Sequence, residues 1–384
     1  MPGCLSSGWR SCRGRAHTQR LSETARPCRP RCRRAVLAPT AAAPKGVLCD
    51  LDGCTFQSGS DTAIPGAAET FAYFRERGIP WLFVTNTGTR TREGLAAKLQ
   101  SMGLPATGDD IVTPAKLAGD WLRANHPGPV ALFVAPDLLP EFQGLPLLDP
   151  AAQSGAGAVV VGDMGLDWTY ESLNRAFRLI MDGVQREEAE LEDAEANGGP
   201  LPPPPMPFIS LGKNRYYRDR DGLGLDIGPF TKALEFATDK QAMVLGKPAP
   251  LIFTLAAAIL GLKPHEVVMV GDDVRGDVGG AQSAGLRGVL VQTGKYRPSD
   301  LRKGVTPDGI LRSLADLPAW WEAQQGAEAE ERRRSEREMA ALAAQLEVLG
   351  ASPDCATLHS VDAATLAEVR RQLGPGGGAV RVGA

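Results

Sequence analysis

The chain has 384 residues, of which 43% are hydrophobic and 23% are charged, and its formal net charge is −3. This is the composition of a globular protein, and the length is sufficient for two domains. No apolar run approaches the roughly 20 residues that a transmembrane helix needs, so we expect neither a membrane span nor a membrane partner.

The first 45 residues differ from the rest of the chain in charge. They hold ten basic residues and a single acid, Glu23, among many Arg, Ser and Ala residues. This composition is typical of an organelle transit peptide, so residues 1–45 are predicted to be a disordered transit segment, with a chloroplast favoured over a mitochondrion. The alternative is a disordered basic arm on a cytoplasmic protein. Because the remainder is acidic, we do not expect nucleic acid as a partner.

From residue 46 onward, strand and helix patterns alternate. A buried strand over 47–53 is followed by an amphipathic helix over 67–78, and a second apolar strand over 79–86 is followed by a helix over 94–103. This order predicts a parallel sheet with helices on both faces.

A second α/β block begins near residue 124. It contains strand patterns at 130–136 and 157–164 and a helix pattern at 169–184. An acidic run, two glycines and four consecutive prolines then fill 185–207, which is therefore predicted to be a disordered insertion. A strand at 208–213 and a helix at 229–238 complete the block.

The first pattern returns after residue 238, with strands and helices alternating up to Trp321. Strands are predicted at 242–248, 266–273 and 288–294, and helices at 250–261 and 279–286. We therefore predict a Rossmann-like, doubly wound α/β domain that is interrupted by an inserted α/β domain. The domain boundaries are predicted as 46–123 and 239–321 for the split domain, 124–238 for the insertion, and 322–384 for a helical, low-complexity extension.

Polar side chains follow four strands of the predicted main domain. They are Asp50 and Asp52, Thr85 and Asn86, Lys247, and Asp272 and Asp273. The carboxyl ends of parallel strands meet at one edge of a sheet, where ligands bind. Gathered carboxylates need a cation, and oxygen ligands without His or Cys indicate Mg²⁺. A hydroxyl and an ammonium beside them suit a phosphoryl group. One aspartate could attack phosphorus while the other transfers the proton.

These segments resemble, in their order along the chain, the four motifs of the haloacid dehalogenase (HAD) superfamily. They read DLDG at 50–53, TN at 85–86, GKP at 246–248 and GDD at 271–273. The insertion lies where that family carries a C2 cap, and the resemblance covers about 46–318. It implies a HAD core with an inserted C2-type cap domain.

The resemblance also implies a role for each motif residue. Asp50 would be the nucleophile and a Mg²⁺ ligand, and Asp52 would be the general acid and base, with its backbone carbonyl on the metal. Thr85 and the backbone of Asn86 would hold the phosphoryl oxygens, and Lys247 would screen their charge.

The fourth motif would complete the metal site. Asp272 would ligate Mg²⁺, and Asp273 and Asp277 would order the groups around it. For Asp277 the alternative is a purely structural role as the cap of the following helix.

The function implied is a Mg²⁺-dependent phosphatase that acts on small phosphorylated substrates, including pyrophosphate or phosphoamino acids, through an aspartyl-phosphate. A plastid phosphoglycolate phosphatase is one alternative, and a non-catalytic scaffold with the HAD fold is another. The intact Asp50, Asp52, Lys247 and Asp272 argue against the scaffold. Whether the protein forms a homodimer is left open.

Substrate choice is expected to depend on the inserted domain. Lys213 and Arg215 follow a predicted strand, and the planar fork of an arginine suits a carboxylate or a second phosphate. We predict that one of these cations meets the anionic, non-reacting end of the substrate. The alternative is that both lie on a solvated rim.

Overall fold

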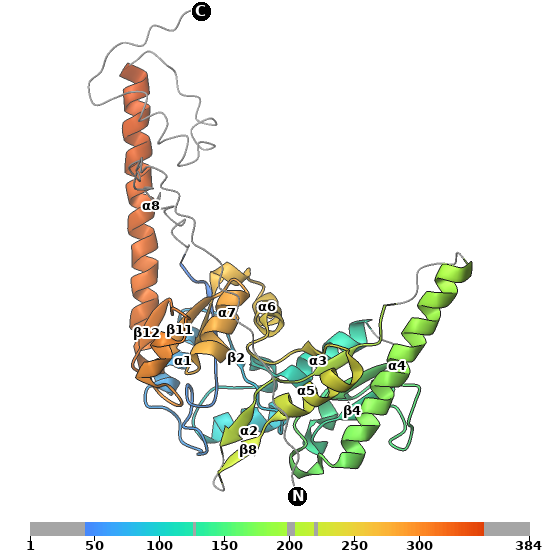
Figure 1. Cartoon of the computed structure of the whole chain (residues 1–384). Helices are drawn as coiled ribbons and strands as arrows, with labels where there is room; N and C mark the ends of the chain where they lie inside the picture. Colours follow the sequence, from blue (N-terminus) through green and yellow to red (C-terminus); the bar gives the residue numbers. More distant parts are fainter. Residues whose placement is uncertain (1–42, 126–127, 198–203, 219–221, 349–384) are drawn as a thin grey trace, which may run out of the picture. The chain divides into compact units, whose positions relative to one another are not determined.

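The structure is a computed structural model that describes residues 43–125, 128–197, 204–218 and 222–348 (Figure 1). Residues 1–42 and 349–384 lie outside the described part of the chain. The predicted transit peptide therefore stays a prediction, as does the final part of the C-terminal extension. No helix in the described ranges combines the length and the apolar character that crossing a membrane requires.

The main domain contains a six-stranded sheet with the order β12-β11-β10-β1-β2-β3, and every pairing in it is parallel. Its strands are β1 (Gly46–Cys49), β2 (Trp81–Val84), β3 (Ile111–Val112), β10 (Val267–Gly271), β11 (Arg287–Val291) and β12 (Gly309–Leu311). Strand β1 lies in the middle, where Cys49 pairs with Val270 on one side and with Phe83 on the other. The predicted doubly wound α/β fold is confirmed.

Helices cover both faces of this sheet. Alternate residues of a strand point to opposite faces, so each face presents apolar side chains that need a covering layer. Leu48 faces a cluster that includes residues of three helices, and Val47 and Cys49 face a second cluster on the other side. The first set of helices is α3 (Pro114–Asn125), α6 (Pro250–Ile259) and α7 (Gly280–Ser283). The second set is α1 (Ala67–Glu76), α2 (Arg92–Ser101) and the start of α8 (Leu317–Val348).

The inserted domain has its own parallel sheet, with the order β4-β5-β6-β9. Its strands are β4 (Val130–Phe133), β5 (Ala158–Val161), β6 (Phe208–Ser210) and β9 (Met243–Val244). Side chains of α4 (Tyr170–Asn197) and α5 (Ile227–Thr238) pack against it in a third hydrophobic cluster. A two-stranded antiparallel hairpin, β7 (Tyr216–Arg218) and β8 (Leu223–Leu225), precedes α5.

Strand β9 corrects one prediction. The sequence pattern at 242–248 was expected to form a strand of the main sheet, but Val244 pairs with Ser210 of the inserted sheet. The physical reason is that this segment directly follows α5, which packs against the inserted sheet, and Ala242 lies in the same hydrophobic cluster. The predicted boundary at 238 therefore separates β9 from the sheet that contains it, and Lys247 reaches the main domain from a loop.

Helix α4 corrects a second prediction. The segment 185–207 was expected to be disordered, yet the helix continues to Asn197 (green in Figure 1). Glu, Ala and Leu are strong helix formers, and no Gly or Pro occurs between 185 and 197. Glu187 is also tied to the fold, because its Oε1 accepts a hydrogen bond from the backbone N of Met206 at 2.6 Å. Residues 198–203 lie outside the described part.

Helix α8 carries the chain out of the main domain. Trp321, in its first turns, is buried and lies 6.3 Å from Phe74 between ring centroids. The same helix then runs without a break to Val348 (Figure 1). The start of the predicted C-terminal extension is thus helical.

Candidate active site

The carboxyl ends of three neighbouring core strands bring the predicted site residues together. β1 ends before Asp50, β2 before Thr85, and β10 before Asp272. A cavity of about 300 Å³ opens at this edge. Its lining includes seven residues that the sequence singled out: Asp50, Asp52, Thr85, Asn86, Lys247, Asp273 and Asp277.

A buried ammonium group lies at the base of the cavity. Lys247, which is only 4% exposed, places Nζ 2.6 Å from Asp50 Oδ1 and 2.8 Å from Asp277 Oδ1, and it donates to the carbonyl of Val84 at 2.9 Å. Its three protons thus have three acceptors. Burial alone would lower the pKa of Lys247, but the carboxylates of Asp277 and Asp50 outweigh burial and raise this pKa above its usual value. The side chain therefore remains a cation.

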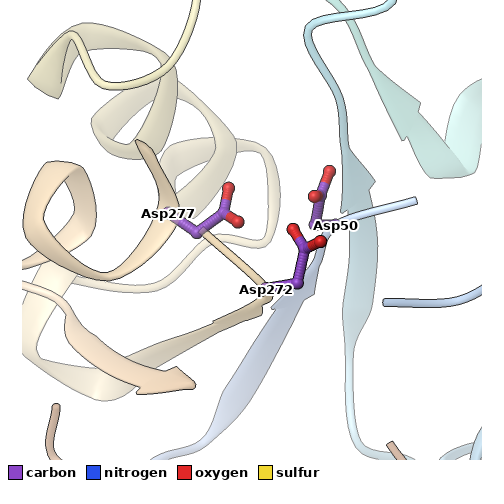
Figure 2. A group of neighbouring side chains, drawn as sticks. All are labelled: Asp50, Asp272 and Asp277. Carbon is purple, nitrogen blue, oxygen red and sulfur yellow. The ribbon is translucent and has the colours of Figure 1, made fainter. Parts of the chain in front are cut away.

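Three carboxylates, those of Asp50, Asp272 and Asp277, lie close together (Figure 2). The Lys247 ammonium group contacts the first and the last of them. One oxygen each from Asp50, Asp272 and Asp277 lies within 4.8 Å of the others, and all three residues are buried. Burial, followed by repulsion from the neighbouring carboxylates, raises the pKa of Asp272 to about 8 and that of Asp277 to about 6. Repulsion of this kind is relieved when a cation binds among the carboxylates.

Asp272 is held on one oxygen and unpaired on the other. Its Oδ2 accepts a hydrogen bond from the backbone N of Lys295 at 2.6 Å, whereas its buried Oδ1 has no hydrogen-bond partner. Gly53 and Gly294 crowd the bonded oxygen: a Cβ atom on either would lie 2.3 or 2.0 Å from Oδ2. Both glycines also have positive φ. Each position therefore requires glycine for two reasons, the lack of space for a Cβ atom and the backbone conformation.

The structure separates the roles of Asp273 and Asp277. Asp273 is the N-cap of the turn Val274–Gly279, because its Oδ1 accepts from the backbone N atoms of Arg275 and Gly276, each at 2.9 Å. Asp277 instead turns inward, where its Oδ2 accepts from the backbone N of Asp273 at 3.0 Å and its Oδ1 meets Lys247. The alternative that Asp277 only caps a helix is wrong.

Asp52 lines the cavity from the turn after β1, and its carboxylate is not one of the three clustered ones. Burial raises the pKa of Asp52, although the positive charges of Lys98, Lys247 and Lys295 act in the opposite direction. The turn is fixed by the hydroxyl of Thr55, which donates to the carbonyl of Asp50 at 2.7 Å. A raised pKa favours the protonated carboxyl group, which is the form that a proton donor needs.

The side chain of Asn86 does something that the sequence did not indicate. Its Nδ2 donates to the carbonyl of Lys247 at 2.8 Å, and its Oδ1 accepts from the backbone N of the same residue at 2.7 Å. This two-point contact fixes the loop that carries Lys247. The neighbouring Thr85 hydroxyl lies 2.8 Å from that of Thr87 and accepts from the backbone N of Thr87 at 3.1 Å.

Lys295 is a site residue that the sequence analysis missed. It lines the cavity, and its Nζ lies 3.3 Å from Asp273 Oδ2. Burial alone would raise the pKa of Asp273, but Lys295 and the N–H groups of Gly276 and Arg275 hold it below its ordinary value. The strand predicted at 288–294 could have indicated this residue, because the carboxyl end of that strand lies at the same sheet edge as the carboxyl ends of β1 and β10.

The two cations predicted to face the substrate lie elsewhere. Lys213 Nζ is 2.7 Å from Oε1 of Glu235, a buried acid of α5. Arg215 is exposed. Among the described residues that line the cavity, the segment contributes Gly212 and Asn214 instead. The prediction that Lys213 and Arg215 face the substrate thus gains no support, and the alternative of a rim position fits Arg215.

Comparisons with known protein families agree with this geometry. A family model described as haloacid dehalogenase-like hydrolase matches residues 47–146, and a second one, HAD-hydrolase-like, matches residues 244–317. The two matches contain all four motifs and lie on either side of most of the inserted domain.

Individual relatives cover the main and inserted domains together. The chain is 38% identical over 283 residues to a phospholysine phosphohistidine inorganic pyrophosphate phosphatase of Xenopus laevis, over 73% of this chain and 95% of the relative. It is 39% identical to haloacid dehalogenase-like hydrolase domain-containing protein 2 of Bos taurus, over 68% of this chain and 89% of the relative. Among solved structures, a p-nitrophenyl phosphatase from Archaeoglobus fulgidus matches with a TM-score of 0.60 and 28% identity, over 73% of this chain and 99% of that one.

Proposed function

The chain belongs to the haloacid dehalogenase family of hydrolases and is a phosphatase, and we propose that it cleaves small phosphorylated substrates through an aspartyl-phosphate. One observation carries the proposal. Asp50 lies buried at the base of a cavity in contact with the Lys247 ammonium group, and a second carboxylate, that of Asp52, lines the same cavity two residues later.

In the proposed first step, a carboxylate oxygen of Asp50 attacks phosphorus, and the bond between phosphorus and the leaving oxygen breaks. Asp52 donates its proton to that leaving oxygen. In the second step, the Asp52 carboxylate takes a proton from a water molecule, whose oxygen attacks phosphorus. Inorganic phosphate leaves, and Asp50 is again a free carboxylate.

Lys247 and the loop after β2 would support both steps. Because Lys247 is fixed between Asp50 and Asp277, its charge is present before the substrate arrives and needs no rearrangement. The hydroxyl of Thr85 and the backbone of Asn86 would hold the other phosphoryl oxygens. The contact between the Asn86 side chain and the backbone of Lys247 makes Asn86 a positioning residue for that ammonium group.

A divalent cation fits the site. The unpaired Oδ1 of Asp272, the raised pKa values of two carboxyl groups and the hard oxygen donors all favour a cation such as Mg²⁺. We propose that Asp50, Asp272 and the backbone carbonyl of Asp52 would hold Mg²⁺, with Asp277 beside it. When bound, Mg²⁺ would supply positive charge against the phosphoryl oxygens.

The proposed substrates are small phosphorylated compounds of the kinds that appear in the relatives' names: pyrophosphate and phosphoamino acids such as phospholysine and phosphohistidine. The decisive test is a panel with Mg²⁺ that contains these compounds, p-nitrophenyl phosphate and phosphoglycolate. We expect release of phosphate that stops when EDTA removes the metal and returns with added Mg²⁺. Absence of hydrolysis across the whole panel would overturn the proposal.

The covalent step has a separate test. Acid quenching during turnover, followed by peptide mass spectrometry, should find a phosphoryl group on the peptide that contains Asp50. Turnover without any such adduct, by a protein that is fully active, would count against the aspartyl-phosphate while leaving phosphatase activity in place.

A further inference from the structure

The wall of the cavity opposite the catalytic residues is formed by the inserted domain. Among the described residues, this cap wall consists of Asp163, Leu211, Gly212, Asn214, Asp226 and Ile227. It presents two carboxylates, one amide and two aliphatic side chains, and its described residues include no cation. The cap wall lines a cavity that also contains Asp50, so it is a surface that a bound substrate would meet.

Asp163 lies against the core. It follows β5, and its Oδ1 accepts a hydrogen bond from the backbone N of Gly165 at 2.9 Å. A Cβ atom built on Gly88 would lie 3.8 Å from Cβ of Asp163, so this cap residue lies beside the core loop that follows Asn86. Asp163 is only partly buried, and it lines the cavity.

Asp226 brings a second carboxylate to the same wall. It is the N-cap of α5, and its Oδ1 accepts from the backbone N of Ile227 at 2.7 Å. Burial raises the pKa of Asp226, and the charge of Asp163 also raises it, whereas hydrogen bonds from Ile227 and Asn214 and the positive charge of Lys295 lower it. Both carboxylates line the same cavity, so a cationic group bound there would meet two negatively charged acceptors.

The cations of this cavity belong to the core and are already paired with acids. Lys247 is bound between Asp50 and Asp277, and Lys295 lies beside Asp273. An anionic group on the leaving part of a substrate would thus approach two cap carboxylates without a cation from the described cap residues. A positively charged group would find two acceptors there, with the side chains of Leu211 and Ile227 beside its hydrocarbon part.

We propose that Asp163 and Asp226 are specificity residues that select substrates whose leaving group carries an ammonium or another cationic donor, over substrates with an anionic leaving group. The proposal rests on the proposed phosphatase function and concerns the same cavity; among the substrates proposed above, it ranks pyrophosphate, whose leaving phosphate is anionic, below phospholysine. It replaces the expectation, based on Lys213 and Arg215, that an anionic end of the substrate binds the cap.

Three phosphomonoesters of similar size test this selection: phosphoethanolamine with a cationic tail, ethyl phosphate with a neutral tail, and phosphoglycolate with an anionic tail. For the unaltered protein with Mg²⁺, kcat/KM should be highest for phosphoethanolamine and lowest for phosphoglycolate. The preference should shrink as salt concentration rises, because part of the cavity is open to solvent.

Two conservative variants locate the selection in the cap wall. Asp226→Asn removes the charge but keeps an N-cap residue, since Asn is as favourable there as Asp. Asp163→Asn keeps an oxygen that can accept from Gly165. Each variant should lower the ratio of kcat/KM for phosphoethanolamine to that for phosphoglycolate by about tenfold or more, the effect of about 1.4 kcal/mol of binding.

Asp167→Asn is the matched control. Asp167 lies in the same loop as Asp163 and is exposed, and it is not among the residues that line the cavity. This variant removes one charge of the same sign and should leave the substrate ratio unchanged. An equal change in Asp167→Asn and Asp163→Asn would attribute the effect to net charge and overturn the proposal.

Three further outcomes decide between the proposal and the function it rests on. If p-nitrophenyl phosphate is hydrolysed but the three substrates show no preference for the cationic tail, or if both Asn variants leave the ratio intact, the proposal is wrong and the phosphatase function stands. If the unaltered protein hydrolyses pyrophosphate or a phosphoamino acid but none of these four compounds, the specificity proposal alone is wrong. If it hydrolyses none of these compounds at all, the proposed function fails and the specificity proposal fails with it.

Discussion

The core wall and the cap wall of the cavity differ in how firmly their charged groups are held. On the core wall, the Lys247 ammonium group has three acceptors, and the backbone of the same residue is fixed by two hydrogen bonds with the side chain of Asn86, one donated and one accepted. On the cap wall, Asp163 is partly buried and holds a backbone N–H with one oxygen. Groups that must meet every substrate in the same geometry are fixed in the core, whereas groups that would distinguish substrates lie on a partly exposed surface.

The largest effect should come from the core residue proposed as nucleophile. Asp50→Asn keeps nearly the same shape but cannot attack phosphorus, so we expect kcat to fall on the order of 10³-fold or more, about 4 kcal/mol of barrier. Steady-state kinetics measures the loss of kcat, and a thermal melt checks that the variant is still folded. Asp137→Asn, an exposed acid of the inserted domain, is the control. Near-normal turnover by folded Asp50→Asn would remove the nucleophile from the mechanism.

Removing the buried cation should damage stability as well as activity. Lys247→Met leaves Asp50 and Asp277 without their ammonium partner, and loss of one member of a buried charge group costs about 3–5 kcal/mol. We expect at least a hundredfold loss in kcat/KM together with a clearly lower Tm. Added Mg²⁺ should recover part of the Tm, because it supplies positive charge to the same carboxylates. An unchanged Tm would show that the three charges are not coupled as described.

A variant of Asn86 should lose less activity than a variant of the nucleophile, because the side chain of Asn86 positions Lys247 and takes no part in the chemical step. Asn86→Ala removes both hydrogen bonds to the backbone of Lys247 but leaves every charge in place. We expect kcat to fall by about tenfold to a hundredfold, since a misplaced group weakens the transition state. The position of the pH optimum should stay the same, which a change in a titrating group would not allow. Asn86→Asp, which keeps only the acceptor, should recover less than half of the loss.

The carboxylates of the core wall should also make stability depend on pH. The pKa of Asp272 is about 8 in the folded chain and that of Asp277 about 6, both above the ordinary value of 3.8. The folded state therefore binds more protons than the unfolded state, and stability falls as pH rises toward these values. Without metal, we expect the free energy of unfolding to be about 2–3 kcal/mol higher at pH 6 than at pH 8.

Two measurements check that pH dependence. Asp272→Asn should flatten the profile of Tm against pH in metal-free buffer. Mg²⁺ should stabilise the protein more at pH 8 than at pH 6, because protons compete with the cation for the same oxygens. A metal-free profile that rises from pH 6 to pH 8 would contradict the raised pKa values.

The smallest effects on stability and kinetics are expected for Lys213 and Arg215, the residues that the sequence analysis predicted to determine substrate specificity. Lys213→Ala removes one partner of Glu235, which keeps Lys232 at 2.6 Å, so we expect a cost of about 1 kcal/mol and a Tm lower by roughly 2 °C. Arg215→Ala should leave Tm unchanged, and it should change KM for pyrophosphate by less than about twofold. A tenfold rise in that KM for Arg215→Ala would return this residue to the substrate site and weaken the assignment of specificity to the cap wall.

The core wall was predictable because its residues follow strands whose pattern is visible in the sequence. Asp50, Thr85 and Asp272 each come directly after a buried apolar run, and the parallel order of the strands brings them together. Lys295 also lies beyond the end of a core strand, but three residues separate it from Val291 of β11, and no motif drew attention to it. The acidic stretch up to Asn197 was misread because composition alone does not distinguish a charged, solvated helix from a disordered loop.

The cap wall was not predictable for a different reason. Asp163 and Asp226 come from turns that are far apart in the sequence, and only the tertiary fold of the inserted domain brings them to one cavity. Lys213 was misassigned because a cation after a strand can turn either toward a ligand or toward a buried acid. Glu235, which decides the matter, lies in a helix that the strand pattern does not reveal as its neighbour.

The central position of β1 has a consequence for how the chain is made. Its residues Gly46–Cys49 pair with β10, whose last residue, Gly271, leaves the ribosome only after the whole inserted domain. Until then β1 can pair only with β2 and presents an open, apolar strand edge to other chains. Pairing of strands that are far apart in the sequence is slow. The main sheet cannot be completed until β10 has been synthesised. Chaperone demand during production should therefore be concentrated between the emergence of β2 and that of β10.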